Sequence, residues 1–97
     1  MSLTQVRHDV LAANSTIARA GLVVLAFGNA SGVDRASGVM VIKPSGIPCD
    51  ELRDEDLVVV RLADGEILEG DRRPSSDTPT HLALYRRFPE IGGVVHT

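Results

Sequence analysis

Apolar residues recur at helical spacing near the start of the chain. They follow one another at intervals of three or four positions, with Gln, Arg and Asp between them: Leu3, Val6, Val10, Ala13 and Ile17. This period places them on one face of an amphipathic helix, so the pattern predicts a helix from Leu3 to Ala20. Ser2 or Thr4 can cap its start, and Gly21 can end it.

The next apolar segment has no helical period. Leu22 to Phe27 is a continuous apolar run that is short for a helix, so it predicts a buried strand. Residues 28–38 contain Gly, Asn, Ser and Asp and therefore predict a loop. Val39 to Lys43 predicts a second short strand, and we expect the two strands to form a hairpin.

The second half of the chain repeats the alternation of strands and turns. Residues 49–56 are acidic and predict a surface turn with a short helix, while residues 57–62 are rich in Val and predict a central strand. The turn at 63–65 contains Asp-Gly, which favours hairpins, so residues 66–69 should form the returning strand.

A second helix and a last strand follow. Thr78 as N-cap and Pro79 at the first helical position predict a helix that ends at Pro89. Residues 91–97 predict another apolar strand. Because hairpins outnumber parallel crossovers, the pattern alone predicts a mostly antiparallel sheet with helices packed on it.

Composition limits the class of protein. The 97 residues include 10 Lys plus Arg and 13 Asp plus Glu, and 43% of them are hydrophobic, which is typical of one globular domain. No apolar run approaches the ~20 residues of a membrane span, and the first residues do not resemble a secretory signal. The single Cys49 suits a reducing compartment. We therefore expect a cytoplasmic location and neither a membrane nor a nucleic-acid partner.

Three polar loops carry candidate chemistry. In Gly28-Asn29-Ala30-Ser31-Gly32 the glycines allow close approach to the backbone, although an ordinary glycine-rich turn has the same composition. Lys43-Pro44-Ser45-Gly46 can hold an anion through backbone N–H groups and one charge, or it is a turn with a solvated lysine. The loop at 73–79 places two serines at a helix start, which suits a phosphate, but Ser, Asp and Thr are also common N-caps.

His96 adds a possible metal ligand. A histidine late in an apolar strand is more often a packed core residue, but with Asp77 it forms a pair that suits Zn²⁺. Two ligands fall short of the three that a catalytic zinc site commonly needs. His8 and His81 lie on predicted helices without a clear partner, and we interpret both as surface or structural residues.

These loops and His96, in this order, resemble the class II aldolase and epimerase family of sugar-phosphate enzymes. The matching stretches are 28–35, 41–46, 74–81 and 92–97. The resemblance covers nearly the whole chain and implies that residues 1–97 are the N-terminal portion of a single domain of this family. It also implies the fold, an α/β three-layer α/β/α sandwich with a mixed, mostly antiparallel sheet.

The resemblance assigns roles residue by residue. The substrate and its phosphate would be bound by Gly28, Asn29, Lys43, Ser45, Gly46, Ser75 and Ser76. The ligands of Zn²⁺, or of another divalent metal, would be Asp77 and His96. Family members continue with His-Thr-His where this chain ends at His96-Thr97, so we expect a second zinc histidine, a third one and the catalytic acid and base residues beyond Thr97. The resemblance therefore leaves no catalytic residue within this chain.

The implied activity is sugar-phosphate chemistry. Asp77 occupies a position where the aldolase branch typically has Glu, so the resemblance favours the epimerase branch, which interconverts L-ribulose 5-phosphate and D-xylulose 5-phosphate in pentose and arabinose catabolism. That branch breaks and remakes a C–C bond by retro-aldol and aldol steps, with a metal as Lewis acid. The family forms homotetramers.

Two alternatives stay open. One is a class II aldolase that cleaves fuculose or rhamnulose 1-phosphate, and the other is a non-catalytic phosphate-binding module or structural subunit. For the 97-residue chain by itself we expect little activity, because two ligands should not hold catalytic zinc tightly.

Overall fold

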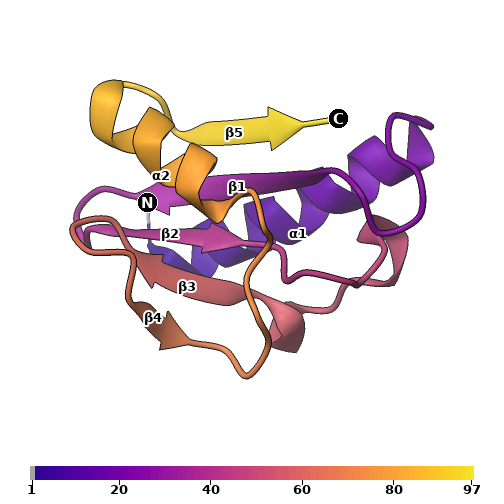
Figure 1. Cartoon of the computed structure of the whole chain (residues 1–97), viewed down its shortest axis with the longest axis horizontal. Coiled ribbons are helices and arrows are strands. Elements are labelled where there is room, and N and C mark those ends of the chain that lie inside the picture. Colours follow the sequence, from indigo (N-terminus) through magenta and orange to yellow (C-terminus); the bar gives the residue numbers. More distant parts are fainter. Residues whose placement is uncertain (1) are drawn as a thin grey trace.

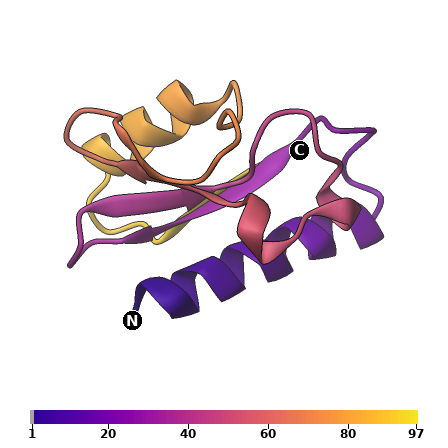
Figure 2. The ribbon, with the colours of Figure 1, turned by 90° about the horizontal axis from the view of Figure 1, so that it is seen from below.

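Two helices lie on opposite faces of one sheet. The computed structural model, which describes residues 2–97, places α1 (Leu3–Arg19) against one face and α2 (Thr78–Arg87) against the other (Figure 1). Seen from below, α1, the strands and α2 form three successive layers (Figure 2). The expected α/β/α arrangement is therefore confirmed.

The sheet has five strands in the order β4-β3-β2-β1-β5. Their bounds are β1 (Asn29–Asp34), β2 (Val39–Ile42), β3 (Val58–Arg61), β4 (Ile67–Glu69) and β5 (Gly93–His96). All four pairings are antiparallel within residues 2–97, so the mostly antiparallel sheet is confirmed and its parallel component does not occur in this part of the chain. Two short 3-10 helices, η1 (Cys49–Glu51) and η2 (Asp54–Asp56), form the predicted acidic turn.

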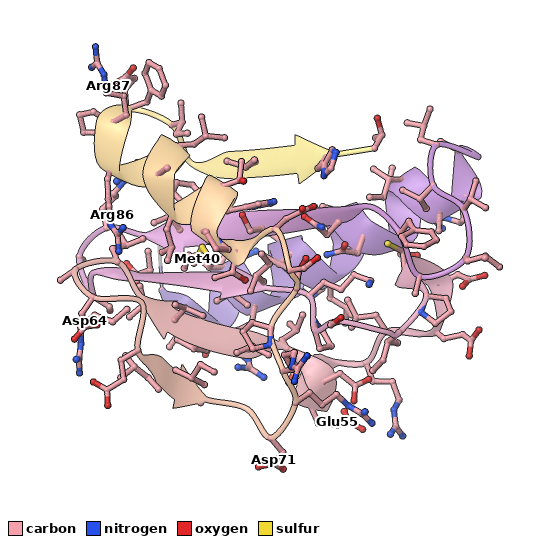
Figure 3. All side chains as sticks on the ribbon, viewed as in Figure 1. Met40, Glu55, Asp64, Asp71, Arg86 and Arg87 are labelled. Carbon is pink, nitrogen blue, oxygen red and sulfur yellow. The ribbon has the colours of Figure 1, made fainter. Side chains whose placement is uncertain are left out.

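Each face of the sheet has its own apolar core. The core on the α1 side consists of Val6, Val10, Val39, Val41, Leu52, Leu57 and Val59. The core on the α2 side consists of Val33, Met40, Ile42, Val58, Val60, Leu82 and Tyr85. Met40 lies between α2 and the sheet, whereas Arg87 extends away from the molecule (Figure 3). Alternate residues of β2 and β3 thus supply both cores, as the pleat of a strand requires.

The first helix agrees closely with its prediction. The Ser2 hydroxyl accepts a hydrogen bond from the Gln5 N–H at 3.2 Å, so Ser2 is the N-cap. The helix ends at Arg19, one residue before the predicted end, and Gly21 follows with a φ of 72°. No helix among residues 2–97 is long and apolar enough to cross a membrane.

The strand predicted for residues 22–27 is wrong. This segment turns at Leu25, whose φ is 55°, and it exposes its large side chains: Leu22, Val24, Leu25 and Phe27 are 55–76% exposed. The apolar run does not enter the sheet because the place beside β2 is occupied by β1. An apolar run alone does not tell a strand from a loop whose apolar side chains line a cavity.

The loop predicted for residues 28–38 is also wrong, because its first half forms β1. All six residues of β1 are buried despite their low strand propensity. A Cβ at Gly32 would lie 3.0 Å from Val10 Cγ2, so glycine lets α1 pack closely on this strand. The Asn14 side chain of α1 bonds both the N–H and the C=O of Ala30, at 2.9 and 3.1 Å. Tertiary contacts, not propensity, make this segment a strand.

The remaining elements follow the predictions with small shifts. β2, β3 and β4 lie within one or two residues of the expected strands, and β5 occupies the middle of the predicted final strand. The N-cap position of α2 is Asp77 instead of Thr78, and the Asp77 side chain makes no capping hydrogen bond. Pro79 lies in the first turn, as expected.

Candidate functional site

All nine residues that the sequence analysis expected to bind phosphate or metal line one cavity of about 610 Å³. They are Gly28, Asn29, Lys43, Ser45, Gly46, Ser75, Ser76, Asp77 and His96. Apolar residues of the 22–27 segment and Thr97 complete the lining. Residues from four separate parts of the chain therefore meet in one place.

The sheet topology brings them together. Strand β1 begins where its neighbours β2 and β5 end, since all pairings are antiparallel. Asn29 and His96 are opposite each other in the β1–β5 register, and Lys43 directly follows β2. The candidate residues thus lie at one edge of the sheet, close to the chain end marked C in Figure 1.

Two of the polar loops are joined by backbone hydrogen bonds. The Ser45 N–H donates to the Arg73 carbonyl at 2.9 Å, and the Ser75 N–H donates to the Lys43 carbonyl at 3.0 Å. Pro44 and Pro74 face each other in an antiparallel bridge. Because these bonds fix the two loops against each other, the exposed Ser45 and the Ser75–Ser76 pair border the same space.

Asn29 connects the strand to the loop before α2. It is 3% exposed, and its Nδ2 donates to Asp77 Oδ2 at 2.8 Å and to Ser75 Oγ at 3.1 Å. Ser75 Oγ also accepts from the Asp77 N–H at 3.2 Å, so its own proton remains available to an acceptor in the cavity. The Asn29 Oδ1 is buried and has no partner among the described residues.

Asp77 and His96 are in direct contact. The His96 Nδ1 donates to Asp77 Oδ2 at 2.5 Å, and the two side chains are 63% and 30% exposed, respectively. The hydrogen bonds from His96 and Asn29 lower the pKa of Asp77 below its usual 3.8. Asp77 is therefore an ionised carboxylate at neutral pH, held beside an imidazole and free of any capping role.

Lys43 brings a buried amine to the cavity. Its side chain is 2% exposed, and its Nζ donates to the Ala26 and Pro44 carbonyls at 3.1 and 3.2 Å. Burial lowers the pKa of this lysine, while the nearby Cys49 acts in the opposite direction. An ammonium has three donors, so one N–H remains for a ligand oxygen.

Two glycines expose backbone to the cavity for different reasons. Gly28 has a φ of 83°, and a Cβ there would lie 2.3 Å from Val23 Cγ1 and 3.1 Å from the His96 carbonyl oxygen. Gly46 has a φ of 85° and open space where a Cβ would stand. A side chain at Gly28 would collide with its neighbours, whereas one at Gly46 would occupy space that is open in the structure.

Two side chains that line the cavity are candidate metal ligands. Asp77 and His96 offer one carboxylate and one imidazole, a donor set that suits Zn²⁺. Among residues 2–97 there is no group of three or more His, Cys, Asp or Glu side chains placed to hold a metal. The pair fits part of a zinc site, and a complete site needs further ligands.

Comparison with known proteins decides the family. Residues 8–97 match the model of the class II aldolase and adducin N-terminal domain. This chain belongs to that family.

Relatives narrow the resemblance within the family. The chain is 50% identical over 95 residues to an L-ribulose-5-phosphate 4-epimerase UlaF of Salmonella paratyphi C, and the match covers 98% of this chain and 41% of the relative. The corresponding UlaF of Salmonella choleraesuis gives the same values. The chain therefore spans about two-fifths of the length of these relatives.

Solved structures of two other proteins share the fold of this chain. An L-fuculose 1-phosphate aldolase superposes with a TM-score of 0.90 at 31% identity, covering 100% of this chain and 45% of the other. YgbL from Klebsiella pneumoniae, described as a putative aldolase/epimerase/decarboxylase, gives a TM-score of 0.88 at 29% identity, with coverages of 99% and 45%. The sheet and its two helices are thus the arrangement of this family.

Sequence reasoning missed several buried polar residues behind the cavity. His81 was interpreted as surface or structural, yet it is 1% exposed and bonds Ser31 on β1. Asn14 lies on the buried face of α1, and its side chain hydrogen-bonds the backbone of Ala30 in β1. The spacing of Asp77, His81 and Tyr85, four residues apart on one helix, was the available signal for His81. No local pattern indicated Asn14.

Proposed function

We propose that this chain is the phosphate-binding part of a sugar-phosphate 4-epimerase that interconverts L-ribulose 5-phosphate and D-xylulose 5-phosphate. The single observation that supports this most is the shared cavity: the nine residues that the family resemblance assigned to substrate and metal line it together. The 50% identity to an L-ribulose-5-phosphate 4-epimerase supports the choice of reaction.

The cavity has the groups that a phosphate ester requires. Lys43 supplies one positive charge, and the Ser45, Ser75 and Ser76 hydroxyls supply neutral donors. Gly28 and Gly46 leave backbone open to the ligand, and the loop before α2 lies at a helix N-terminus, which favours anions. In this proposal the phosphate is held by one ammonium and several neutral donors.

Asp77 and His96 would hold a divalent metal in the same cavity. Asp77 is ionised and exposes 30% of its side chain, so it can replace its bond to His96 with a bond to a cation. When bound, the metal supplies Lewis-acid stabilisation of negative charge on the substrate's oxygens. Asn29 would keep the carboxylate oriented through its bond to Oδ2.

The reaction explains why both functions share a cavity. A retro-aldol step splits the sugar phosphate between C3 and C4 into an enediolate and glycolaldehyde phosphate. The aldehyde then turns and adds back with C4 inverted. The residues that grip the phosphate keep this fragment from leaving while it turns, so binding energy from a non-reacting group serves the reacting centre.

An aldolase is the second candidate. The L-fuculose 1-phosphate aldolase has the same fold with a TM-score of 0.90, so the fold does not separate the two reactions. Release of free glycolaldehyde phosphate from L-ribulose 5-phosphate, or cleavage of fuculose or rhamnulose 1-phosphate, would favour this alternative. The remaining expectations, a homotetramer and a cytoplasmic location, stay proposals of the same kind.

The test is a chimaera in which residues 1–97 precede the remainder of the Salmonella paratyphi C relative. We expect it to convert L-ribulose 5-phosphate and to bind zinc, whereas the 97-residue chain by itself should show little turnover. Asp77→Asn should lower zinc affinity at least about tenfold in the chimaera. A chimaera that folds and binds zinc but leaves this substrate unchanged would contradict the epimerase proposal.

The phosphate role has its own matched variants. Ser76→Ala should raise KM for the phosphorylated substrate more than it changes kcat, because it removes a donor to a group that does not react. Ser15→Ala is the control, since Ser15 is a partly buried serine on α1 that does not line the cavity. Equal effects of the two substitutions would argue against phosphate binding at Ser76. Substantial turnover by the unextended chain would refute the expectation that it lacks activity.

A further inference from the structure

Three residues form a buried chain of hydrogen bonds outside the cavity described above. Ser31 Oγ lies 2.6 Å from His81 Nδ1 and 2.7 Å from Tyr85 Oη. His81 and Tyr85 are at most 1% exposed, and Ser31 is 6% exposed. None of the three lines the 610 Å³ cavity, so neither phosphate nor metal binding there explains why polar groups occupy this part of the core.

These hydrogen bonds follow the Asn29–Asp77 bond of the cavity in a regular order along β1 and α2. Asp77 at the N-cap of α2 and His81 and Tyr85 within the helix are spaced by four residues, and four helical residues rise about 6 Å. Asn29 and Ser31 are spaced by two along β1 and lie on one face, about 6.6 Å apart along the strand. The Asn29–Asp77 bond and the Ser31–His81 bond are therefore successive rungs between the same strand and the same helix.

The three polar groups share few protons. Burial raises the pKa of Tyr85, which keeps its hydroxyl protonated. The Ser31 oxygen lies within hydrogen-bond distance of both side chains, and its single proton is available to one of them. His81 Nε2 is buried and has no partner among the described residues.

Apolar contacts between α2 and the sheet do not set this register. Leu82 packs on the same face of the sheet and supplies buried area, but dispersion and hydrophobic contacts are non-directional. A slide of α2 by one residue, about 1.5 Å, would keep much of that area and break every rung. Hydrogen bonds are directional, so a paired network in the core stabilises one position of α2 on the sheet.

We infer that Ser31, His81 and Tyr85 are positioning residues that hold Asp77 against Asn29, and thereby keep the cavity in its binding arrangement. This inference rests on the proposed function only for what the cavity binds. It assigns a role to His81 beyond that of a buried structural residue. In this inference the three residues preserve the hydrogen bond between Asn29 and Asp77.

The experiment uses the 97-residue chain and two readouts. The first is the solvent exchange of the Asn29 side-chain amide protons by NMR, since Nδ2 donates to Asp77 and Ser75. The second is the affinity for inorganic phosphate and for Zn²⁺. Ser31→Ala and His81→Gln should speed Asn29 amide exchange. Each should also lower, by about tenfold, the affinity for the probe that the parent chain binds, phosphate or Zn²⁺.

The controls separate positioning from stability. Leu82→Ala removes buried area from the same helix, so it should lower stability while Asn29 exchange stays slow. His81→Asn should restore slow Asn29 exchange and probe affinity relative to His81→Gln, because an Asn side chain can place a hydrogen-bonding atom where His81 Nδ1 stands. Where a variant fails to fold, Tyr85→Phe serves in its place, since it removes one hydroxyl and should change the His81 ¹⁵N pattern, which reports the tautomer of the ring.

Two outcomes would overturn the inference. One is slow Asn29 exchange and unchanged affinity in a folded Ser31→Ala chain. The other is an equal acceleration by Leu82→Ala, which would show that any loss of stability has the same effect. A chain in which Asn29 exchange responds as expected, but which does not bind inorganic phosphate, supports the positioning role and counts against the proposed phosphate site.

Discussion

Strands β1 and β3 are both buried in the same sheet, but they are held there by different forces. In β3, Val58, Val59 and Val60 are at most 1% exposed and pack alternately into the two apolar cores. In β1 the sequence is Asn-Ala-Ser-Gly-Val-Asp, and Val33 is its single large apolar residue. β3 is stabilised by the area that it buries, whereas β1 depends on named hydrogen bonds.

This difference explains where the site lies. A strand of valines fills a core and has no group left for chemistry, while β1 carries Asn29 at the cavity and Ser31 beneath α2. Buried polar groups are costly unless they are paired, so β1 requires partners on both helices. Asn14 of α1 and His81 of α2 are those partners.

The largest loss of stability is expected when the hydrogen bonds that hold β1 against α1 are removed. Asn14→Leu keeps a similar shape but leaves the Ala30 N–H and C=O unpaired in the core, so it should cost about 3 kcal/mol of unfolding free energy. The matched change in β3 is Val59→Ala, which should cost about 2 kcal/mol through lost burial and a cavity. Urea unfolding of both variants measures the two values. A smaller loss for Asn14→Leu than for Val59→Ala would contradict the comparison.

A smaller effect concerns the close approach of α1 to β1. Gly32→Ala places a Cβ 3.0 Å from Val10 Cγ2 and 3.2 Å from Val6 Cγ1, so overpacking should cost about 1 kcal/mol. Combining it with Val10→Ala should recover part of that loss, because the second change removes the atom in the way. A double-mutant cycle from thermal or urea unfolding measures this coupling. Strict additivity would show that α1 does not pack on Gly32 as described.

The smallest effect is electrostatic and depends on pH. The pKa of Asp77 is lowered in the fold, first by His96 and then by Asn29, so its carboxylate stabilises the fold fully above the usual value of 3.8. That contribution is lost as pH falls through the lower folded pKa. Asp77→Asn should therefore cost less than about 1 kcal/mol at pH 7, and the difference from the parent chain should shrink below about pH 4.

The control for this titration is Asp71→Asn, an exposed carboxylate at the outer edge of the molecule (Figure 3). It should change the unfolding free energy by less than about 0.5 kcal/mol at either pH. Chemical denaturation at several pH values measures both variants. A difference for Asp77→Asn that grows on acidification would mean that the carboxylate is not held in its ionised form by these bonds.

The sequence by itself determined the elements whose burial is driven by their own apolar side chains, and its resemblance to a family named residues that meet in one place. The period of α1, the valines of β3 and the Asp-Gly turn before β4 each produce the expected element. The nine candidate residues, chosen through the resemblance to a family, line one cavity.

Only the tertiary structure decided the conformation of the two segments on either side of Gly28. Residues 22–27 are apolar, but all except Leu25 line the cavity and the larger ones are exposed, while Asn29–Asp34 are mostly polar or small and form a buried strand. Local propensity misassigned both segments, because the forces that place them come from residues distant in sequence. Asn14, His81 and Tyr85 satisfy the polar groups of β1, and a buried hydrogen bond exists only when the fold brings both of its partners together.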